Sequence, residues 1–298
     1  MNRSVTLRQI EVFVHVARGG NLTAAAVRLG LSQSAASMSL GELERLLGGP
    51  LFHRVGRGLC LNDRGRSLLP SAEAVLLAFR DFSDRAGGEG GLSGDLVVAC
   101  STTIANYLFP SCMKAFLEAH RGLSLSLDVG NTEEIAEEVR KGEADLGLVE
   151  GDCADQGLVT EKWLRDELLL CASPRHPLVT ARSVPLSRLA GETWIFREEG
   201  AGTLSTLLKA FAEEDFFPDR ILHIGHTEAI KRAVEAGLGV SCLSRFALSR
   251  ELRSGDLALI DTPFRPHRWF CLIHRRGPRS AALTLLVDWL LDRRSLLT

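Results

Sequence analysis

The chain has 298 residues and a net charge of −2, with 45% hydrophobic and 24% charged residues. This balance is typical of a globular protein with one small and one larger domain, and it excludes whole-chain disorder and collagen-like repeats. The charge is uneven, because residues 1–66 contain nine arginines and only four acidic residues. Arginine at one end favours a phosphate-bearing partner such as nucleic acid, although a solvated charged surface explains the composition equally well.

Several classes of protein are not expected. The longest uncharged run, residues 96–113, contains polar residues and a proline, so we expect no transmembrane helix. Charged residues from Arg3 to Arg18 do not fit a secretory signal, which predicts a cytoplasmic protein. Seven widely spaced cysteines without a CxxC pair indicate neither a disulfide framework nor a zinc site. Only 6% of residues are aromatic, which argues against a base-stacking RNA platform.

Capping signals at the N-terminus predict a helix-turn-helix. Thr6 and Gln9 fit a capping box, while Thr23 and Ser32 are placed to cap two further helices. Glycines mark the end of each apolar periodic stretch. The expected helices cover residues 7–19, 24–29 and 33–47. The tight turn between the second and third is typical of this motif.

A wing and a long helix are expected next. Two β-prone runs, 51–55 and 59–61, flank Gly56-Arg57-Gly58 and predict a hairpin. Asn62 would then cap a helix that runs to Arg85, in which Pro70 should cause a kink or a weak start. Apolar residues recur on it at the 4-3-4-3 spacing of paired helices, at Leu68, Ala72, Val75, Phe79 and Phe82. Packing against its own domain is the alternative. Glycines between 87 and 94 predict a hinge.

Strands alternate with helices from Asp95 onward, which predicts an α/β domain with a mostly parallel sheet and enough units for two lobes. The expected strands are 96–100, 123–129, 146–150, 168–172, 194–196, 221–224, 240–243 and 269–274. The expected helices are 104–119, 132–141, 203–214, 227–236 and one from Arg279.

The third helix has the surface of a DNA reader. Its apolar stripe faces inward through Ala36, Leu40, Leu43 and Leu47, which places Ser34, Met38, Gly41 and Arg45 outward and Gln33 and Ser37 in the exposed first turn. Gln and Ser side chains bond base edges or phosphates, and Met38 could contact a thymine methyl. Arg54 and Arg57 on the wing would contact phosphates or enter the minor groove. The alternative is an ordinary solvated helix.

The segments Asn21–Ser37, Leu43-Glu44, Leu51–Arg54 and Leu61–Gly65 resemble the N-terminal signature of LysR-type transcriptional regulators. The resemblance implies a winged helix-turn-helix over 1–61, a linker and dimerisation helix over 62–86, a hinge over 87–94 and a two-lobed, periplasmic-binding-protein-like effector domain over 95–298. Lobe 1 would comprise about 95–165 and 268–298, and lobe 2 about 166–267. The resemblance also implies that residues matching the family's DNA contacts lie at the DNA: Thr23, Gln33, Ser34, Ser37, Arg54 and Arg57. Met38 departs from the basic or larger polar residue common in the family.

Four predicted helix starts bring hydroxyls and free amides to strand ends, where anions bind well. They are Ser101-Thr102-Thr103, Asn131-Thr132, Gly200-Ala201-Gly202-Thr203 and His226-Thr227. Each alone is an ordinary N-cap, but four at one interlobe cleft would form a ligand site. The resemblance implies that Ser101 to Thr103, Gly200 to Thr203 and Thr227 surround an effector, and we add Asn131. Residues 102–110, 130–131 and 149–151 are similar to the branch that governs sulfur and carbon assimilation, so we expect a small inorganic anion or short carboxylate.

Other functions find less support. Histidine spacing and the absence of nucleophile or phosphate-loop motifs predict no catalysis, no metal and no cofactor. A solute-binding transport protein is the main alternative, and an enzyme on the same scaffold the second. Cys100 and Cys242 could form a redox switch, but burial as inert thiols is favoured, and His223 and His226 are expected to pack at a strand end. The expected partners are double-stranded promoter DNA, an anionic effector, RNA polymerase and further copies in a dimer of dimers, with no membrane.

Overall fold

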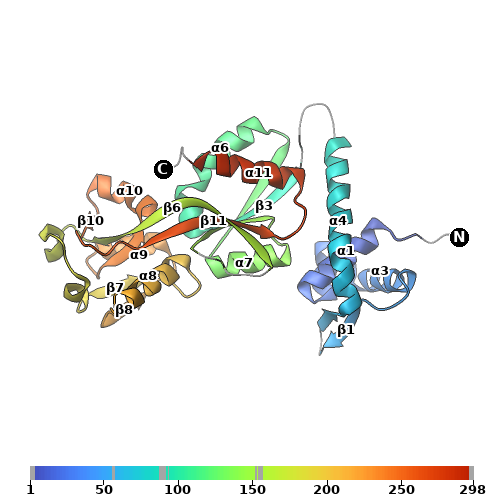
Figure 1. Ribbon diagram of the computed structural model, residues 1–298, viewed down its shortest axis with the longest axis horizontal. Coiled ribbons are helices and arrows are strands. Elements are labelled where there is room, and N and C mark those ends of the chain that lie inside the picture. Colours follow the sequence, from blue (N-terminus) through green and yellow to red (C-terminus); the bar gives the residue numbers. More distant parts are fainter. Residues whose placement is uncertain are drawn as a thin grey trace. The chain divides into compact units, whose positions relative to one another are not determined.

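The computed structural model describes residues 4–55, 58–86, 92, 94–151, 153 and 157–294. The chain divides into two compact units, one built on the N-terminal helices and one on the α/β region from Asp95 to Arg275 (Figure 1). No helix within these described ranges has the length and apolar character needed to cross a membrane.

The first unit is a helix-turn-helix with a two-stranded hairpin, as predicted. Its elements are α1 (Leu7–Gly19), α2 (Leu22–Arg28), α3 (Gln33–Leu46), β1 (Phe52–Val55), β2 (Gly58–Leu61) and α4 (Asp63–Ala86). The capping box at Thr6 and Gln9 is present, and Ser32 Oγ accepts from the amide of Ala35 at the start of α3. The antiparallel pairing of β1 with β2 places Phe52 opposite Leu61. A core of α1, α2 and α3 side chains, with Leu51 and Phe52, holds the unit together.

The cap predicted for the second helix is wrong. Asn21, not Thr23, is the N-cap, because its Oδ1 accepts from the amides of Thr23 and Ala24. The helix therefore begins two residues earlier than expected, and Thr23 lies within its first turn.

The apolar side chains of the long helix α4 are packed near its start and exposed farther along. Asn62 caps it as predicted, with Oδ1 accepting from the amide of Gly65 at 2.8 Å, and the helix continues without a break through Pro70. Leu68 and Ala72 pack on the core of the first unit. Farther along, the remaining apolar positions are exposed by 45–69%, at Val75, Phe79 and Phe82. Most of the expected hinge, at 87–91 and 93, lies outside the described residues.

The second unit has two lobes joined by two long strands, β6 (Leu158–Ala172) and β11 (His267–Arg275) (Figure 1). We call first lobe the end that contains β3 (Gly94–Ser101), α5 (Thr102–Tyr107), α6 (Phe109–Ala119), β4 (Leu123–Gly130), α7 (Thr132–Lys141) and β5 (Leu146–Glu150). We call second lobe the end that contains β7 (Thr193–Phe196), α8 (Gly202–Glu213), β8 (Arg220–His223), α9 (Thr227–Glu235), β9 (Ser241–Ser244), α10 (Arg245–Ser254) and β10 (Ala258–Leu259). The short 3₁₀ helices η1 (Pro177–Thr180) and η2 (Leu186–Leu189) precede β7, and α11 (Ala281–Asp292) follows β11.

The expectation of a mostly parallel sheet is wrong. The main sheet has the order β10-β6-β11-β5-β3-β4, with β9 also paired to β6. The pairs β3–β5 and β7–β8 are parallel, whereas β11 is antiparallel to both β5 and β6, and β6 is antiparallel to β9 and β10. The strands β6 and β11 account for the antiparallel pairs. Each of them runs through both lobes and pairs with strands that run in the opposite direction.

Two helical predictions also need correction. The helix expected over 104–119 is two helices, α5 and α6, which separate at Leu108. Pro110 explains the break, because it lacks an amide hydrogen and is accommodated in the first turn of a new helix. The helix α10 was not predicted from the sequence.

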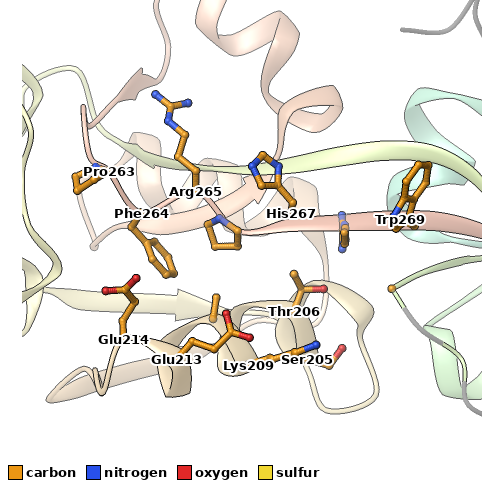
Figure 2. Close-up of a pocket in the computed structure, with 14 residues that line it drawn as sticks. Ser205, Thr206, Lys209, Glu213, Glu214, Pro263, Phe264, Arg265, His267 and Trp269 are labelled. Atoms are coloured by element: carbon orange, nitrogen blue, oxygen red, sulfur yellow. The ribbon is translucent and has the colours of Figure 1, made fainter.

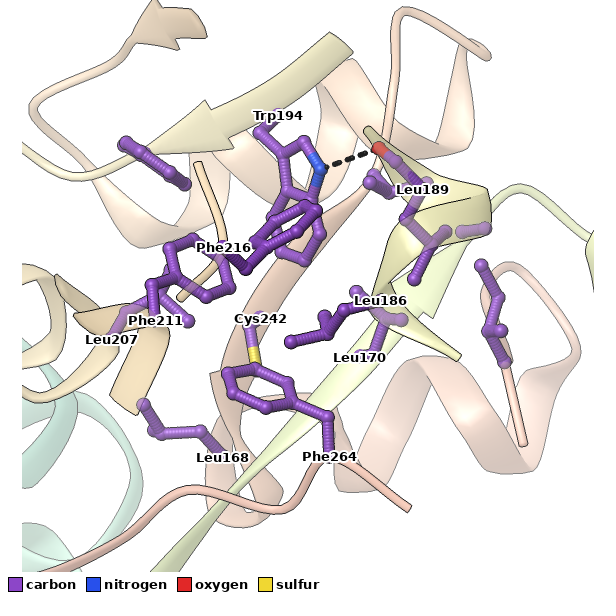
Figure 3. Close-up of a cluster of buried hydrophobic side chains, with 14 of the residues drawn as sticks. Leu168, Leu170, Leu186, Leu189, Trp194, Leu207, Phe211, Phe216, Cys242 and Phe264 are labelled. Carbon is purple, nitrogen blue, oxygen red and sulfur yellow. Dashed lines mark hydrogen bonds between the residues drawn. The ribbon is translucent and has the colours of Figure 1, made fainter. Parts of the chain in front are cut away.

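The second lobe has an aromatic core that fixes the start of α8. Trp194, Phe211 and Phe216 pack with Phe264, and the indole Nε1 of Trp194 donates to the carbonyl of Leu189 at 3.0 Å (Figure 3). Because buried aromatic side chains are costly to displace, this core holds β7 and α8 in a fixed relation.

Candidate functional site

The outward face of α3 is polar and open. Ala36, Leu40 and Leu43 are buried against α1 and α2. The residues expected at DNA bases lie on the opposite side and are exposed, at Gln33, Ser34, Ser37 and Met38. Met38 is 76% exposed, so its apolar tip is free to contact a partner surface.

The other residues expected at DNA are also on the surface where they are described. Thr23 on α2 and Arg54 on β1 are exposed. Arg45 forms an ion pair with Glu42, one turn earlier on the helix, at 2.7 Å. The carboxylate of Glu42 therefore lowers the net positive charge of this face. Arg54 makes no ion pair with any residue that the structure describes. Arg57 lies outside the described residues.

In the second unit, two of the expected effector segments meet around a buried carboxylate. Glu150 ends β5, and its Oε1 accepts from the backbone amide of Thr103 at 3.3 Å. Its Oε2 accepts from Thr203 Oγ1 at 2.8 Å and from Arg268 Nη1 at 2.5 Å. Arg268 also donates through Nε to Asp166 at 2.8 Å.

This cluster is charged despite its burial. Burial opposes the charge of Glu150, but Arg268 and the hydrogen bonds from Thr103 and Thr203 outweigh it and lower the pKa of Glu150 to about 2. Burial is the larger effect at Asp166 and raises the pKa of that carboxyl. An internal carboxylate thus lies at the starts of α5 and α8. Thr103 and Thr203 bond to the protein itself.

A second arginine lies where the lobes meet. Arg197 directly follows β7, is 4% exposed, and donates through Nη1 to Thr227 Oγ1 at 3.0 Å. Its Nη2 reaches Thr102 Oγ1 of the first lobe at 3.4 Å. Two hydroxyls expected at the effector, one from each lobe, are therefore held by one guanidinium. Glu198 completes the arrangement, since it accepts from Nε and Nη2, each at 2.7 Å.

The remaining effector positions line the same junction. Gly200 adopts a left-handed φ of +82°, and a Cβ there would lie 3.0 Å from Asn131 Oδ1. A Cβ on Gly202 would lie 2.1 Å from the carbonyl oxygen of Glu150, so only glycine fits. Ala201 is the N-cap of α8 without a side-chain bond, whereas Asn131 and Glu134 form a capping box on α7. At Gly200 and Gly202 the second lobe thus approaches the first through its backbone, beside the side-chain contacts of Arg197 and Thr203.

Ser101 lies at the start of α5, where the sequence predicts it. It occupies the N-cap position of α5, but its side chain makes no capping bond. Its Oγ is buried without a hydrogen-bond partner among the described residues. His226 caps α9 through Nδ1, and His223 contacts the carbonyl of Arg197, so both pack at an element end.

Three charged residues of this junction were not predicted as site residues from the sequence: Glu150, Arg197 and Arg268. A signal was present, because Glu150 and Arg197 each end a run of apolar strand residues, where a charge must be paired. Arg268 lies between apolar and aromatic residues of a strand in the same way.

The two cysteines considered for a redox switch are inert thiols, and no metal centre is found in the part of the chain that the structure describes. Cys100 and Cys242 are buried, and burial raises the pKa of both thiols well above the usual value. Such thiols are poor nucleophiles. No group of three or more potential metal ligands gathers among the described residues.

A cavity of about 720 Å³ lies elsewhere in the second unit, between α8 and the segment that leads into β11 (Figure 2). Lys209, Glu213 and Glu214 line one side of it, and Arg265 and His267 the other. None of the effector residues expected from the sequence is among its described lining residues. Its charged lining residues are mixed in sign.

Comparison with known proteins identifies the two units. Residues 7–66 match the bacterial regulatory helix-turn-helix protein, lysR family, and residues 89–295 match the LysR substrate binding domain. The chain belongs to the LysR family of bacterial transcriptional regulators. This membership favours the regulator over the solute-binding transport protein, since a LysR regulator combines both matched domains in one chain.

Three similar proteins illustrate the relationship. An uncharacterised HTH-type transcriptional regulator of Escherichia coli K12, YeiE, is 37% identical over 287 residues, which cover 96% of this chain and 97% of that one. The Synechocystis PCC6803 CcmR regulatory domain in complex with 2-PG is 29% identical with a TM-score of 0.63, and the match covers 67% of this chain and 97% of that one. Full-length CbnR complexed with its target DNA is 25% identical with a TM-score of 0.57 and coverage of 97% and 99%.

Proposed function

We propose that this LysR-family regulator binds a small anionic effector at Arg197 and binds promoter DNA through α3 and the β1–β2 wing. The observation that carries the effector site is the position of Arg197, whose guanidinium bonds a hydroxyl of each lobe, Thr102 and Thr227. An anion held there would contact both lobes at once. It would therefore favour one orientation of the lobes over others, since a ligand shifts an equilibrium by its difference in affinity for the two states.

The other arginine of this region does not offer the same site. Arg268 is paired through Nε and Nη1 with Asp166 and Glu150, whose side chains are at most 2% exposed, while its buried Nη2 has no partner among the described residues. Displacing either carboxylate would leave a buried charge unpaired, which is strongly unfavourable. Arg197 has one carboxylate partner, and that partner is partly exposed. The complex of CcmR with 2-PG supports a ligand site in this domain.

The exposed polar face of α3 supports DNA binding. Gln33, Ser34, Ser37 and Met38 present polar groups and an apolar tip to a major groove, and Arg54, which has no ion-pair partner among the described residues, provides a cation for a phosphate. The CbnR complex with target DNA belongs to the same structural class and supports this assignment.

The exposed stripe on α4 supports self-association. Val75, Phe79 and Phe82 follow a seam spacing and have no covering partner among the described residues. Pairing of two α4 helices would bury them, and a dimer of dimers would place several reading helices on one promoter. A change of lobe orientation would then alter the spacing of those helices and the bend of the DNA. We further propose a cytoplasmic location, contact with RNA polymerase at the promoter and no catalytic activity.

Calorimetry tests the effector site. The full-length protein is titrated with sulfite, sulfate, thiosulfate and small organic acids, and the titrations are repeated with Arg197→Gln. We expect one of these anions to bind the wild type and to bind Arg197→Gln at least about 10-fold more weakly, because charge-assisted hydrogen bonds contribute about 1.5–3 kcal/mol.

Two control variants make the result specific. Arg188→Gln removes an exposed arginine of the second lobe, and Lys209→Gln removes a cation that lines the separate cavity. Both should bind the anion as the wild type does. Loss of binding in Lys209→Gln alone would indicate that the effector binds in the cavity instead of at Arg197. Binding of only uncharged or cationic ligands would reject an anionic effector.

A further inference from the structure

The carboxylate of Glu198 occupies the edge of Arg197 that an anionic effector would use. Its two oxygens accept from Nε and Nη2 at 2.7 Å each, the side-on bidentate geometry of the strongest arginine–carboxylate pairs. The guanidinium is almost fully buried, with 3% of its side chain exposed, whereas 32% of the Glu198 side chain is exposed. The pair therefore joins a fixed cation to an anion that water can reach.

The rest of Arg197 does not depend on Glu198. Nη1 donates to Thr227, and the backbone carbonyl of Arg197 contacts His223 at 3.1 Å. Because these bonds involve other atoms, the guanidinium can keep its position when the carboxylate leaves. Glu198 is followed by the left-handed Gly200, which lies against Asn131 of the first lobe. Movement of this segment is thus coupled to the contact between the lobes.

From this geometry we propose that Glu198 is an intramolecular competitor that sets both the affinity and the selectivity of the effector site. The proposal rests on the proposed effector site at Arg197. An effector must exchange with the carboxylate, so it must replace two hydrogen bonds at the Nε and Nη2 edge. Groups with two suitably spaced acceptor oxygens satisfy this condition: carboxylate, sulfonate, sulfate, thiosulfate or phosphate. Uncharged ligands and halide ions do not.

Replacement of the Glu198 carboxylate by an effector anion needs no further reactant. One anion replaces another at the guanidinium, and the released Glu198 carboxylate moves into water, where 32% of its side chain already lies. Glu150 cannot act in this way, because its side chain is 2% exposed and it accepts from three residues. The difference in exposure assigns the competitor role to Glu198.

Removing the charge of Glu198 tests the proposal. Full-length wild type, Glu198→Gln and Glu199→Gln are titrated calorimetrically with sulfate, thiosulfate, acetate and chloride. Glu199 is the matched control, since it is the exposed neighbour in the same segment. We expect Glu198→Gln to bind at least one of the first three anions about 10-fold more tightly than the wild type, Glu199→Gln to match the wild type, and chloride to gain nothing. The double variant Arg197→Gln/Glu198→Gln should lose the gain.

The outcomes separate this proposal from the proposed effector site. If an anion binds the wild type through Arg197 but binds Glu198→Gln no more tightly, the competitor is rejected and the effector site stands. If Arg197→Gln never changes anion binding in any background, both are rejected. Thermal unfolding checks that Glu198→Gln is folded. Should it not fold, Glu198→Asp replaces it, because the shorter carboxylate cannot span both nitrogens; an unchanged affinity in that variant would equally reject the competitor.

Discussion

Two buried arginines of the second unit, Arg268 and Arg197, differ in how far their carboxylate partners are exposed. Arg268 lies between Glu150 and Asp166, and all three side chains are at most 2% exposed. Arg197 is equally buried, but its carboxylate partner Glu198 is 32% exposed. A cation whose partners are all buried cannot exchange them, whereas a cation with a solvent-exposed partner can. Exposure of the partner, not of the arginine, distinguishes the two.

The largest expected effect concerns stability. Arg268→Gln leaves Glu150 and Asp166 buried without their cation, and we expect it to lower the free energy of unfolding by about 3–5 kcal/mol. Arg197→Gln should cost much less, about 1 kcal/mol, because Glu198 can turn to water. Urea unfolding of the two variants and the wild type measures both. Similar losses of unfolding free energy in Arg268→Gln and Arg197→Gln would contradict the difference between the two arginines.

The acid dependence of stability sharpens the same comparison. The pKa of Glu150 is lowered to about 2 in the folded protein, from an ordinary value near 4.5. Its stabilisation is therefore complete above about pH 4.5 and is lost as the pH falls toward 2. Glu150→Gln should flatten the decrease of Tm between pH 5 and 3. Tm measured against pH in this variant and in the wild type tests this, and equal slopes would contradict the assignment.

A third arginine, fully on the surface, extends the comparison to the first unit. Arg54 on β1 makes no described ion pair, so Arg54→Ala should leave stability within about 0.5 kcal/mol of the wild type. It should weaken binding to all DNA sequences alike and reduce the salt slope of log K by about 1. Fluorescence anisotropy with specific and unrelated duplexes at several salt concentrations measures both. Loss of discrimination at a single base position would instead make Arg54 a base reader.

Local signals of the sequence were sufficient for the first unit. The capping box at Thr6, the cap at Ser32 and the glycine turn around residues 56–58 each depend on residues a few positions apart. The wrong prediction of Thr23 as the cap of α2 also concerns neighbouring residues only, since Asn21 offers a better cap two residues earlier.

The second unit depends on pairings that no local pattern contains. Glu150 and Arg268 are 118 residues apart, and the antiparallel pairing of β11 with β5 and β6 joins similarly distant segments. Hydroxyls at helix starts correctly indicated which segments lie together, including Thr102 with Thr227 around Arg197. They did not reveal that the protein supplies its own carboxylates there, because an internal anion and a bound anion favour the same donors.

The most direct test of the whole account is footprinting of the wild type and Arg197→Gln on the DNA upstream of the protein's own gene, with and without the anion that calorimetry selects. The account predicts protection by both proteins, and a footprint that the anion changes in length or in hypersensitive positions for the wild type only. Absence of protection by the wild type even in dilute buffer, or the same anion-dependent change in both proteins, would contradict it.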